Sequence, residues 1–311
     1  MTISIIIPAY NAKVTIFDAL DSALNQTLRA DEIIVIDDGS TDGTGEAVAE
    51  KYGTRMTVIR QDNRGVAEAR NHGIEVSTGG YLQFLDADDM LDPRKLERSL
   101  AACQASSAEV SYSPALFVGA DGRTPVNIKF PPLPSGQILT EWLIGTMANG
   151  SYGVMSSMFV ARDALLQAGG FDKACTPCED WDMWIRLAAR NRFAALNLPL
   201  VTYRVSPGSL SSHALRLAKG RLTVIRRARE LPEVQARLSE AVLDRLEAGR
   251  WHVYAMRLWE SGQPREAREA FTAADRLAPS PVRALYRRIS YILPASSASL
   301  MDRVLQLRGK K

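Results

Sequence analysis

The sequence predicts an α/β fold for residues 1–213, with a mostly parallel sheet and helices on both faces, followed by an α-helical region at 214–311. Short apolar runs alternate with amphipathic helical patterns in the first part of the chain, which is typical of parallel sheets. Several of these runs end in polar clusters, as strands do when their carboxyl ends face a ligand crevice. After His213 the composition changes to Ala, Leu, Arg and Glu with helical spacing.

The first elements follow from the spacing of apolar and turn-forming residues. Uninterrupted runs of Ile and Val predict buried strands, and apolar residues three or four apart predict helices. Asp42 or Thr44 would cap the second helix, and Gly73 would close the third. The predicted order is strand 3–7, helix 14–27, strand 32–36, a helix to Tyr52, strand 56–60, helix 63–73 and strand 81–85.

Short strands and loops are predicted for the middle of the chain. Val110–Ser113 and Leu116–Val118 are expected to flank a turn at 120–123. The later elements are predicted as a short helix over 138–148, a strand over 154–161, a helix entered through 175–189 and a last strand at 199–204.

The segment Tyr81–Asp89 begins as an apolar strand and ends on three carboxylates. Asp86 and Asp88 lie two residues apart, so they share a face on an extended chain. Unpaired buried carboxylates are costly, which places these groups at an exposed sheet edge. A hard divalent cation with bound phosphates would relieve their repulsion there. A polar turn is the competing interpretation, with Asp89 or Asp92 capping the next helix.

Polar clusters follow three of the predicted strands, at Tyr10–Asn11, Asp37–Asp38 and Asp86–Asp89. The carboxyl ends of parallel strands meet at one edge of a sheet. The sequence therefore predicts one site built from three loops.

The composition is that of an ordinary globular protein, with 46% hydrophobic and 23% charged residues among 311. No apolar run reaches membrane-spanning length and no leader pattern opens the sequence, so a cytoplasmic location is expected. Cys103, Cys175 and Cys178 do not make a disulfide framework. Cys175 and Cys178 supply half of a zinc site, and we interpret this pair as a loop feature without a metal.

Charge is distributed unevenly along the chain. Residues 214–311 hold 20 Lys+Arg and 10 Asp+Glu, a net charge of +10, which leaves −7 for the rest. The basic segment 286–293 could make peripheral contact with an anionic membrane at its inner face. A solvated helix face is the competing interpretation. No nucleic-acid motif accompanies the charge, so no nucleic-acid partner is expected.

Residues 248–279 contain one pattern that resembles a tetratricopeptide (TPR-like) repeat. A single repeat cannot bury its own apolar face and needs neighbouring helices. A plain helical hairpin explains the pattern equally well. The matching positions are Trp251, Ala255, Leu258, Gly262, Ala267, Phe271, Ala274 and Pro279.

Five motifs together resemble the glycosyltransferases of family 2 (GT2), whose Rossmann-like nucleotide-sugar-binding fold is called GT-A. The resemblance spans residues 1–212 and does not include the tail. It implies an inverting enzyme that moves a sugar from a nucleotide-sugar to a hydroxyl acceptor, in the synthesis of a surface polysaccharide or another glycan. The motifs are Ile5–Asn11, Asp37–Thr44, Asn63–Gly73, Phe84–Asp89 and Glu179–Trp184.

The resemblance also implies roles on the donor side. A uridine-linked sugar is the favoured donor, while thymine and guanine stay open as bases. Asp38, with Asp37 beside it, would recognise the base edge, and Asp86 would lie near the ribose. The residues implied to bind the nucleotide-sugar are Pro8, Ala9, Tyr10, Asp37, Asp38, Arg70 and Asp86.

The resemblance assigns the chemistry to Asp88 and Asp180. Asp88, the second Asp of the D-x-D pair, would bind Mn²⁺ or Mg²⁺, with Asp86 and His213 as further candidates. Asp180, adjacent to Glu179, would be the catalytic base. These roles suit the reaction, because a cation offsets the charge of the departing diphosphate and a carboxylate can take the acceptor proton. A structural interpretation competes for Asp180, as an acidic residue in the first turn of a helix.

The sequence departs from the family where a histidine often follows the last strand. Ser206 stands at that point, and His213 could substitute for the missing histidine. This departure leaves open a catalytically silent module that binds a nucleotide or sugar and recruits a partner through the helical tail. A nucleotidyltransferase is disfavoured, because the loop Ile7–Ala12 contains no glycine for a phosphate-binding turn.

Overall fold

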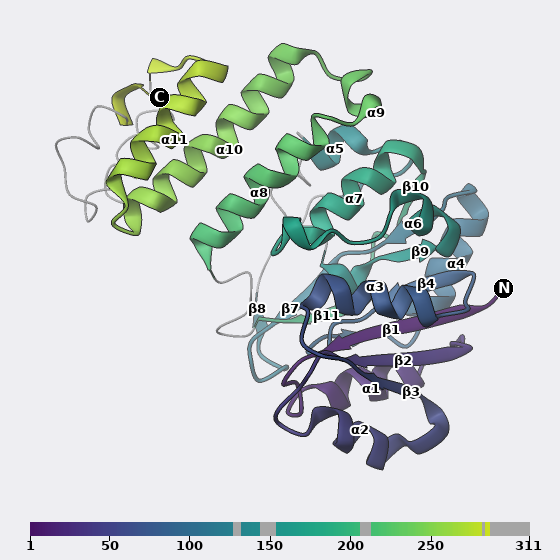
Figure 1. The fold of residues 1–311 in the computed structure, drawn as a ribbon. Helices are drawn as coiled ribbons and strands as arrows, with labels where there is room; N and C mark the ends of the chain where they lie inside the picture. The colour runs from purple at the N-terminus through teal and green to yellow at the C-terminus, as the bar shows by residue number, and fades with distance from the viewer. Residues whose placement is uncertain (127–131, 144–153, 206–212, 282–283, 287–311) are drawn as a thin grey trace. The chain divides into compact units, whose positions relative to one another are not determined.

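The chain divides into two compact units, Met1–Pro207 and Gly208–Lys311. Each unit is built around its own elements (Figure 1). The computed structural model describes residues 1–126, 132–143, 154–205, 213–281 and 284–286.

The first unit alternates strands and helices around one large sheet. Its elements are β1 (Ile3–Ala9), α1 (Ile16–Leu24), β2 (Glu32–Asp37), α2 (Thr44–Tyr52), β3 (Thr57–Arg60), α3 (Val66–Val76), β4 (Tyr81–Phe84), β5 (Met90–Leu91), α4 (Lys95–Ser106), β6 (Val110–Tyr112), β7 (Ala115–Val118), β8 (Pro125–Val126), α5 (Leu139–Leu143), β9 (Phe159–Ala161), α6 (Arg162–Ala168), α7 (Glu179–Arg190), β10 (Phe193–Ala195) and β11 (Val201–Arg204). Seven strands form a sheet in the order β10-β6-β9-β4-β1-β2-β3. Its neighbours run parallel, except that β9 is antiparallel to β4 and β6. The predicted α/β fold with a mostly parallel sheet is confirmed.

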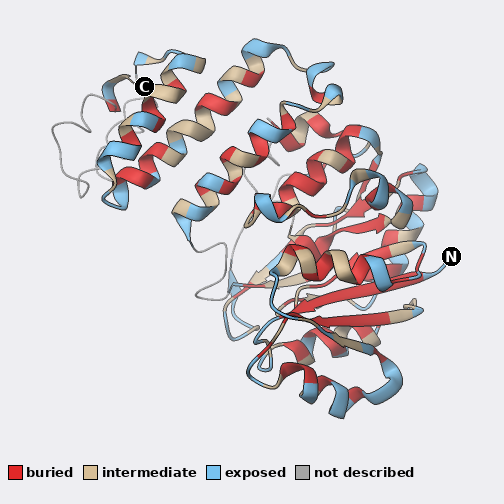
Figure 2. Cartoon of the chain, viewed as in Figure 1, coloured by how far each residue is buried: buried red, intermediate tan, exposed pale blue. Residues whose placement is uncertain are grey.

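Helices cover both faces of this sheet (Figure 1). Ile5 of β1 and Val35 of β2 belong to the core that α1, α2 and α4 help to form. Ile34 and Ile36, on the alternate face of β2, pack with Ala69 of α3. β1 is buried along its whole length (Figure 2). The uninterrupted apolar runs in the sequence therefore reflect burial of the strands on both faces.

Helix α3 lies close against β1 because residue 73 is a glycine. A Cβ at Gly73 would lie 2.3 Å from Cγ2 of Ile6. The helix continues past this glycine to Val76, so the prediction that Gly73 closes it was wrong. The glycine serves close packing rather than helix termination.

A second sheet contains four short strands in the order β5-β11-β7-β8. β11 was predicted as a last strand, and it pairs with β7 in this smaller sheet. The expectation that Val110–Ser113 and Leu116–Val118 flank the turn at 120–123 was wrong, because β6 joins the large sheet and β7 pairs with β8 across that turn. The strand predicted over 154–161 begins only at Phe159, after a 3₁₀ turn at Met155–Ser157.

The predicted helix over 138–148 is described only in part, as α5, and its remainder lies outside the described residues.

The second unit is helical, as predicted, with α8 (Ala214–Ala228), α9 (Pro232–Gln235), α10 (Glu240–Glu260) and α11 (Pro264–Leu277). α10 and α11 are joined by a turn at Gly262, which has a φ of +78°. Ala255, Trp259 and Phe271 are fully buried between them. Arg229 joins the end of α8 to α10 through three carboxylates, those of Glu240, Asp244 and Glu247. The TPR-like interpretation of this hairpin stays a prediction.

Among the described residues, no helix combines the length and the apolar character that a bilayer crossing requires.

Candidate active site

The three polar clusters follow neighbouring strands, because β4, β1 and β2 are adjacent in the large sheet. Ala9 at the end of β1 lies opposite Asp37 at the end of β2, and Ile6 lies opposite Phe84 at the end of β4. Their carboxyl ends therefore form one edge of the sheet, here called the donor edge and made of residues 9–13, 37–45 and 85–89.

Two loops of the donor edge are interlocked. The backbone N–H groups of Asn11, Ala12 and Lys13 donate to the side chains of Ser40, Thr44 and Asp42, at 3.0, 3.0 and 3.1 Å. In return, the side-chain oxygen of Asn11 accepts the N–H of Thr41 at 2.8 Å. Pro8 and Ala9 are buried in the strand that leads into this contact, whereas Tyr10 is 53% exposed. Of Pro8, Ala9 and Tyr10, which the resemblance implies to bind the nucleotide-sugar, only Tyr10 has an exposed side chain.

Asp37 is buried and holds the loop that follows it. One of its oxygens accepts the N–H of Ser40 at 2.9 Å, and the other lies 3.4 Å from Nη1 of Arg60. A Cβ at Gly45 would lie 2.5 Å from this second oxygen, so a glycine is required beside it. These contacts give Asp37 a structural function at the edge.

Asp38 ties the second loop to the start of α3. Its Oδ1 accepts from Nε2 of Gln61 and from the N–H of Arg64, and its Oδ2 accepts the N–H of Gly65 at 2.8 Å. Gln61 in turn contacts Nδ1 of His72 at 2.6 Å. A carboxylate can accept about four hydrogen bonds, so Asp38 retains acceptor capacity for a base edge.

Arg70 of α3 joins the donor edge to helix α7. Its Nη2 lies 2.8 Å from Asp86 and its Nη1 lies 2.9 Å from Glu179. The guanidinium also stacks on Phe171, with 5.4 Å from its carbon to the ring centroid. Asn71 fixes Phe171 through both backbone groups at 2.8 Å. Because Arg70 is buried, both of these ion pairs are shielded from solvent.

The three carboxylates after β4 have different surroundings. Asp86 pairs with Arg70, and its side chain is 25% exposed. Asp89 is fully buried and accepts from Ser156 Oγ at 2.6 Å and from the N–H of Arg204 at 3.2 Å. It does not cap α4, as one interpretation expected. Asp92, the other candidate cap, accepts the N–H of Arg94 at 2.9 Å, but Arg94 is the N-cap residue and no described side-chain hydrogen bond caps α4.

Asp88 lies between these two groups and has no ion pair among the described side chains. Burial and the charge of Asp86 raise the pKa of Asp88 to about 6, and Arg204 acts in the opposite direction. A carboxylate in this position gains from a bound cation, because the cation would favour its charged form.

A metal at this edge would depend on few protein ligands. In the part of the chain that the structure describes, no group of three or more His, Cys, Asp and Glu residues is arranged to hold one. Asp86 and Asp88 are the carboxylates of this segment that remain for a ligand, since Asp89 is fully buried and hydrogen-bonded to Ser156 and to the N–H of Arg204. One or two carboxylates, completed by water and substrate phosphates, suffice for Mg²⁺. The residues thus fit a divalent cation that is bound together with a diphosphate.

Glu179 and Asp180 begin helix α7, on the side of Arg70 opposite Asp86 along its two ion pairs. Asp180 accepts the N–H of Trp181 at 2.6 Å, so it does stabilise the first turn of its helix. Burial and the negative charge of Glu179 raise the pKa of Asp180 to about 7, against the opposing effect of Arg70. A carboxyl group with such a pKa can act as a general base near neutral pH. The structural and the catalytic interpretations of Asp180 are therefore compatible.

Two side chains of the site were not predicted from the sequence. Arg204 ends the predicted last strand, at 199–204, and was given no role there. Its guanidinium binds Asp18 at 2.8 Å and lies near Asp88. Ser156 stands in a segment predicted as plain strand, and nothing in its sequence context marks it. Both reach the edge through tertiary contacts that sequence spacing does not show.

The remaining candidates lie elsewhere or outside the description. His213 precedes α8 in the second unit and is exposed, so its role as a metal ligand stays a prediction. Ser206 and most of the basic segment 286–293 lie outside the described residues. Cys175 and Cys178 are buried before α7 and are not joined by a disulfide.

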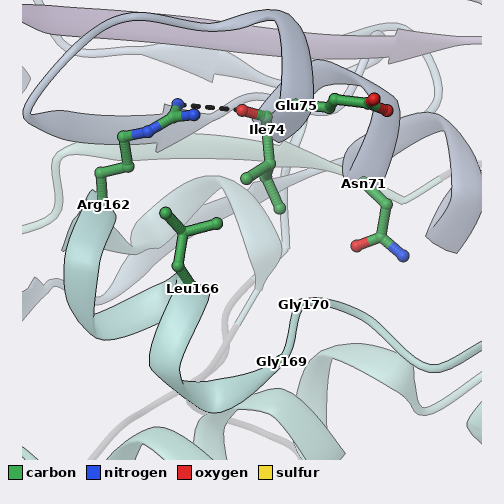
Figure 3. Close-up of a pocket in the computed structure, with 7 residues that line it drawn as sticks. All are labelled: Asn71, Ile74, Glu75, Arg162, Leu166, Gly169 and Gly170. Carbon is green, nitrogen blue, oxygen red and sulfur yellow. Dashed lines mark hydrogen bonds between the residues drawn. The ribbon is translucent and has the colours of Figure 1, made fainter.

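A separate surface cavity of about 380 Å³ lies between α3 and α6 (Figure 3). Its lining includes Asn71, Leu166 and Arg162, whose Nη1 donates to the carbonyl of Ile74 at 2.9 Å. It contains none of the carboxylates of the donor edge. This cavity is thus separate from the place where the acidic groups gather.

Comparison with known proteins places this arrangement in a family. The sequence profile described as Glycosyl transferase family 2 matches residues 4–153, which include the whole donor edge. A putative teichuronic acid biosynthesis glycosyltransferase, TuaG, from Bacillus subtilis is 31% identical over 239 residues, covering 75% of this chain and 91% of TuaG. The chain belongs to glycosyltransferase family 2. An uncharacterized glycosyltransferase from Haemophilus influenzae is 32% identical over 224 residues, covering 70% of this chain and 74% of the relative.

Solved structures show the same fold for this family 2 enzyme. Residues 1–349 of TarS from Staphylococcus aureus, in complex with UDP-GlcNAc, give a TM-score of 0.65 at 20% identity, covering 93% of this chain and 88% of that one. The mannosyltransferase PcManGT from Pyrobaculum calidifontis, in complex with GDP-Man and Mn²⁺, gives 0.57 at 18% identity, covering 96% and 86%. These structures show the GT-A fold, and the sequence relatives show the glycosyltransferase class of enzyme.

Proposed function

We propose that this glycosyltransferase transfers a sugar from a uridine-linked donor to a hydroxyl group of a growing glycan, with inversion at the anomeric carbon. The observation that carries the proposal is the Arg70 bridge, which brings Asp86 and Glu179 to one buried cation. Asp180 interacts electrostatically with Arg70 and Asp86 in the same cluster. Donor-binding and base functions are thus supported within one site.

The donor would lie along the donor edge. Tyr10 offers an exposed ring for the base, and Asp38 retains an acceptor position for its edge. Asp86 and Asp88 would hold a divalent cation, either Mn²⁺ or Mg²⁺, together with the diphosphate. When bound, such a cation offsets the charge that develops on the departing diphosphate. A neighbour of the same fold binds GDP-Man and Mn²⁺, and another binds UDP-GlcNAc, which supports both parts of this proposal.

Asp180 would act on the acceptor. Its carboxylate takes the proton of the acceptor hydroxyl as the oxygen forms a bond to the anomeric carbon. The bond from that carbon to the phosphate oxygen breaks, and its electron pair leaves with the diphosphate. Arg70 holds Glu179 and Asp86 on either side, so it keeps the two halves of the site in register. A single displacement of this kind inverts the configuration of the sugar.

A role in surface polysaccharide synthesis is proposed by analogy with the relative TuaG, a putative glycosyltransferase of teichuronic acid biosynthesis. A cytoplasmic site of action, with peripheral contact to the inner membrane face through the basic tail, extends this proposal. The acceptor would then be a lipid-linked glycan.

A product analysis tests the proposal. The enzyme is incubated with α-linked uridine diphosphate sugars and a panel of saccharide acceptors in Mn²⁺, and the anomeric configuration of the product is determined by NMR. We expect a β-linked product. An α-linked product would contradict a single displacement, and transfer only from guanosine- or thymidine-linked sugars would correct the base.

A further inference from the structure

A 3₁₀ turn at Met155–Ser157 lies behind the carboxylates of the donor edge. Ser156 is fully buried in this turn, and its hydroxyl contacts the acidic loop at two places. It accepts the backbone N–H of Asp86 at 3.0 Å and donates to Oδ2 of Asp89 at 2.6 Å. One hydroxyl therefore joins the first and the last residue of the segment Asp86–Asp89.

The turn itself is anchored by two buried side chains. Gln83 of β4 donates from Nε2 to the carbonyl of Ser156 at 2.8 Å. Lys95 of α4 donates from Nζ to the carbonyl of Ser157 at 2.5 Å. Both side chains are fully buried, and breaking a hydrogen bond to a buried amine or amide leaves a desolvated polar group. The position of Ser156 is thus imposed by the core of the first unit.

The other contacts of the acidic loop complete its support. Oδ1 of Asp89 accepts the N–H of Arg204, and Oδ1 of Asp86 pairs with Arg70. Asp88 is the carboxylate of this segment for which neither an ion pair nor a hydrogen bond to another described residue holds the side chain, whereas Asp86 pairs with Arg70 and Asp89 is hydrogen-bonded. The direction of the Asp88 side chain is therefore set by the backbone of the segment Asp86–Asp89. Ser156 holds this segment at both of its ends.

We propose that Ser156 is a positioning residue for the donor: it holds the Asp86–Asp89 backbone in the conformation that presents Asp88 to the cation and diphosphate. This inference rests on the proposed function, because it assumes that the donor binds at this edge. Groups that orient metal-binding side chains from behind commonly change affinity by about 10- to 100-fold when they are removed.

The alternative is that Ser156 only fills the core, and Ser157 provides a matched control for it. Ser157 lies in the same turn and is equally buried. Its hydroxyl donates to the carbonyl of Val154 at 2.8 Å, within the turn, and makes no hydrogen bond to the acidic loop. Replacing either serine by alanine removes one buried hydroxyl, but only Ser156→Ala releases the acidic loop.

The experiment is calorimetric titration of uridine diphosphate in Mn²⁺ into the full chain of the wild type, Ser156→Ala and Ser157→Ala, with thermal unfolding measured for each. We expect both variants to unfold at similarly lowered temperatures, while only Ser156→Ala loses about 10-fold or more in affinity. Ser156→Cys, which keeps the size but hydrogen-bonds weakly, replaces Ser156→Ala if that variant does not fold.

Equal affinities for the two serine variants would overturn the inference and leave the proposed function standing. Absence of binding by the wild type would overturn the proposed site itself, and this inference with it. The two failures are therefore distinguishable in one set of titrations.

Discussion

Arg70 and Glu179 are 109 residues apart in the sequence and form an ion pair of 2.9 Å in the interior of the first unit. Arg70 also binds Asp86, so one guanidinium connects the carboxyl end of β4 with the first residue of α7. Both partners in the Arg70–Glu179 pair have side chains less than a tenth exposed. A single buried guanidinium therefore couples the two parts of the site that are proposed to bind the donor and to hold the base.

The first prediction follows from this burial. Arg70→Met leaves Glu179 buried without a counter-charge, and we expect the free energy of unfolding to fall by about 3–5 kcal/mol, measured by urea denaturation. Arg94→Met is the control, since Arg94 is half exposed and lies 3.5 Å from Asp92. Its effect should stay below about 1 kcal/mol. Similar losses for the two variants would show that the Arg70 bridge does not stabilise the unit.

The second prediction concerns the base. Asp180→Asn keeps the size of the side chain but cannot take a proton, so we expect sugar transfer to fall by about 10²- to 10⁴-fold with uridine diphosphate binding retained. Asp182→Asn is a matched control in the same helical turn, because Asp182 is committed to Arg186 at 2.6 Å. Transfer near the wild-type rate in Asp180→Asn would remove the base assignment.

The third prediction is a pH dependence. The pKa of Asp180 is raised to about 7 by burial and by the charge of Glu179, and a base acts only when it is deprotonated. We therefore expect kcat/KM to be full above this pKa and to fall as the pH is lowered through about 7. Enzyme returned from low to high pH should regain its rate, which separates titration from unfolding. A rate that stays constant down to pH about 5 would be inconsistent with Asp180 as the base.

The fourth prediction concerns the packing of α3 on β1. Gly73→Ala would place a Cβ 2.3 Å from Ile6, and we expect overpacking to cost about 1–3 kcal/mol in the free energy of unfolding. Gly249→Ala is the contrasting change, since no atom lies within 4 Å of a Cβ at that helical position. It should stabilise its helix by up to about 1 kcal/mol, because alanine favours helix over glycine. A neutral Gly73→Ala would mean that α3 can shift without strain.

The local part of the structure could be predicted from the sequence. The runs at Ile3–Ala9 and Glu32–Asp37 are apolar because the sheet buries both faces, and the polar residues after them mark its carboxyl edge. These signals are local, so the α/β fold and the convergence of three loops were accessible. Gly73 was misinterpreted because a glycine required by a tertiary contact looks the same in sequence as one that ends a helix.

The non-local part could not be predicted. The partners of Arg70 lie 16 and 109 residues away in the sequence, and neither the helix nor the strand periodicity of the sequence relates residues so far apart. β6 and β7 are close in sequence but join different sheets, which only the pairing with β9 and β11 decides. Ser156 acts through one hydroxyl in a short 3₁₀ turn, and such a turn has no sequence signature comparable to that of a helix or strand.

The most direct test of the account is calorimetric titration of uridine diphosphate into the wild type and Asp88→Ala, each with and without Mn²⁺. The account predicts binding that requires Mn²⁺ in the wild type and is lost in Asp88→Ala, since the Asp88 side chain has neither an ion pair nor a hydrogen bond to another described residue, whereas Asp86 and Asp89 are both engaged. Binding of equal strength in both proteins, or binding indifferent to Mn²⁺, would contradict the assignment of the cation and the diphosphate to this edge.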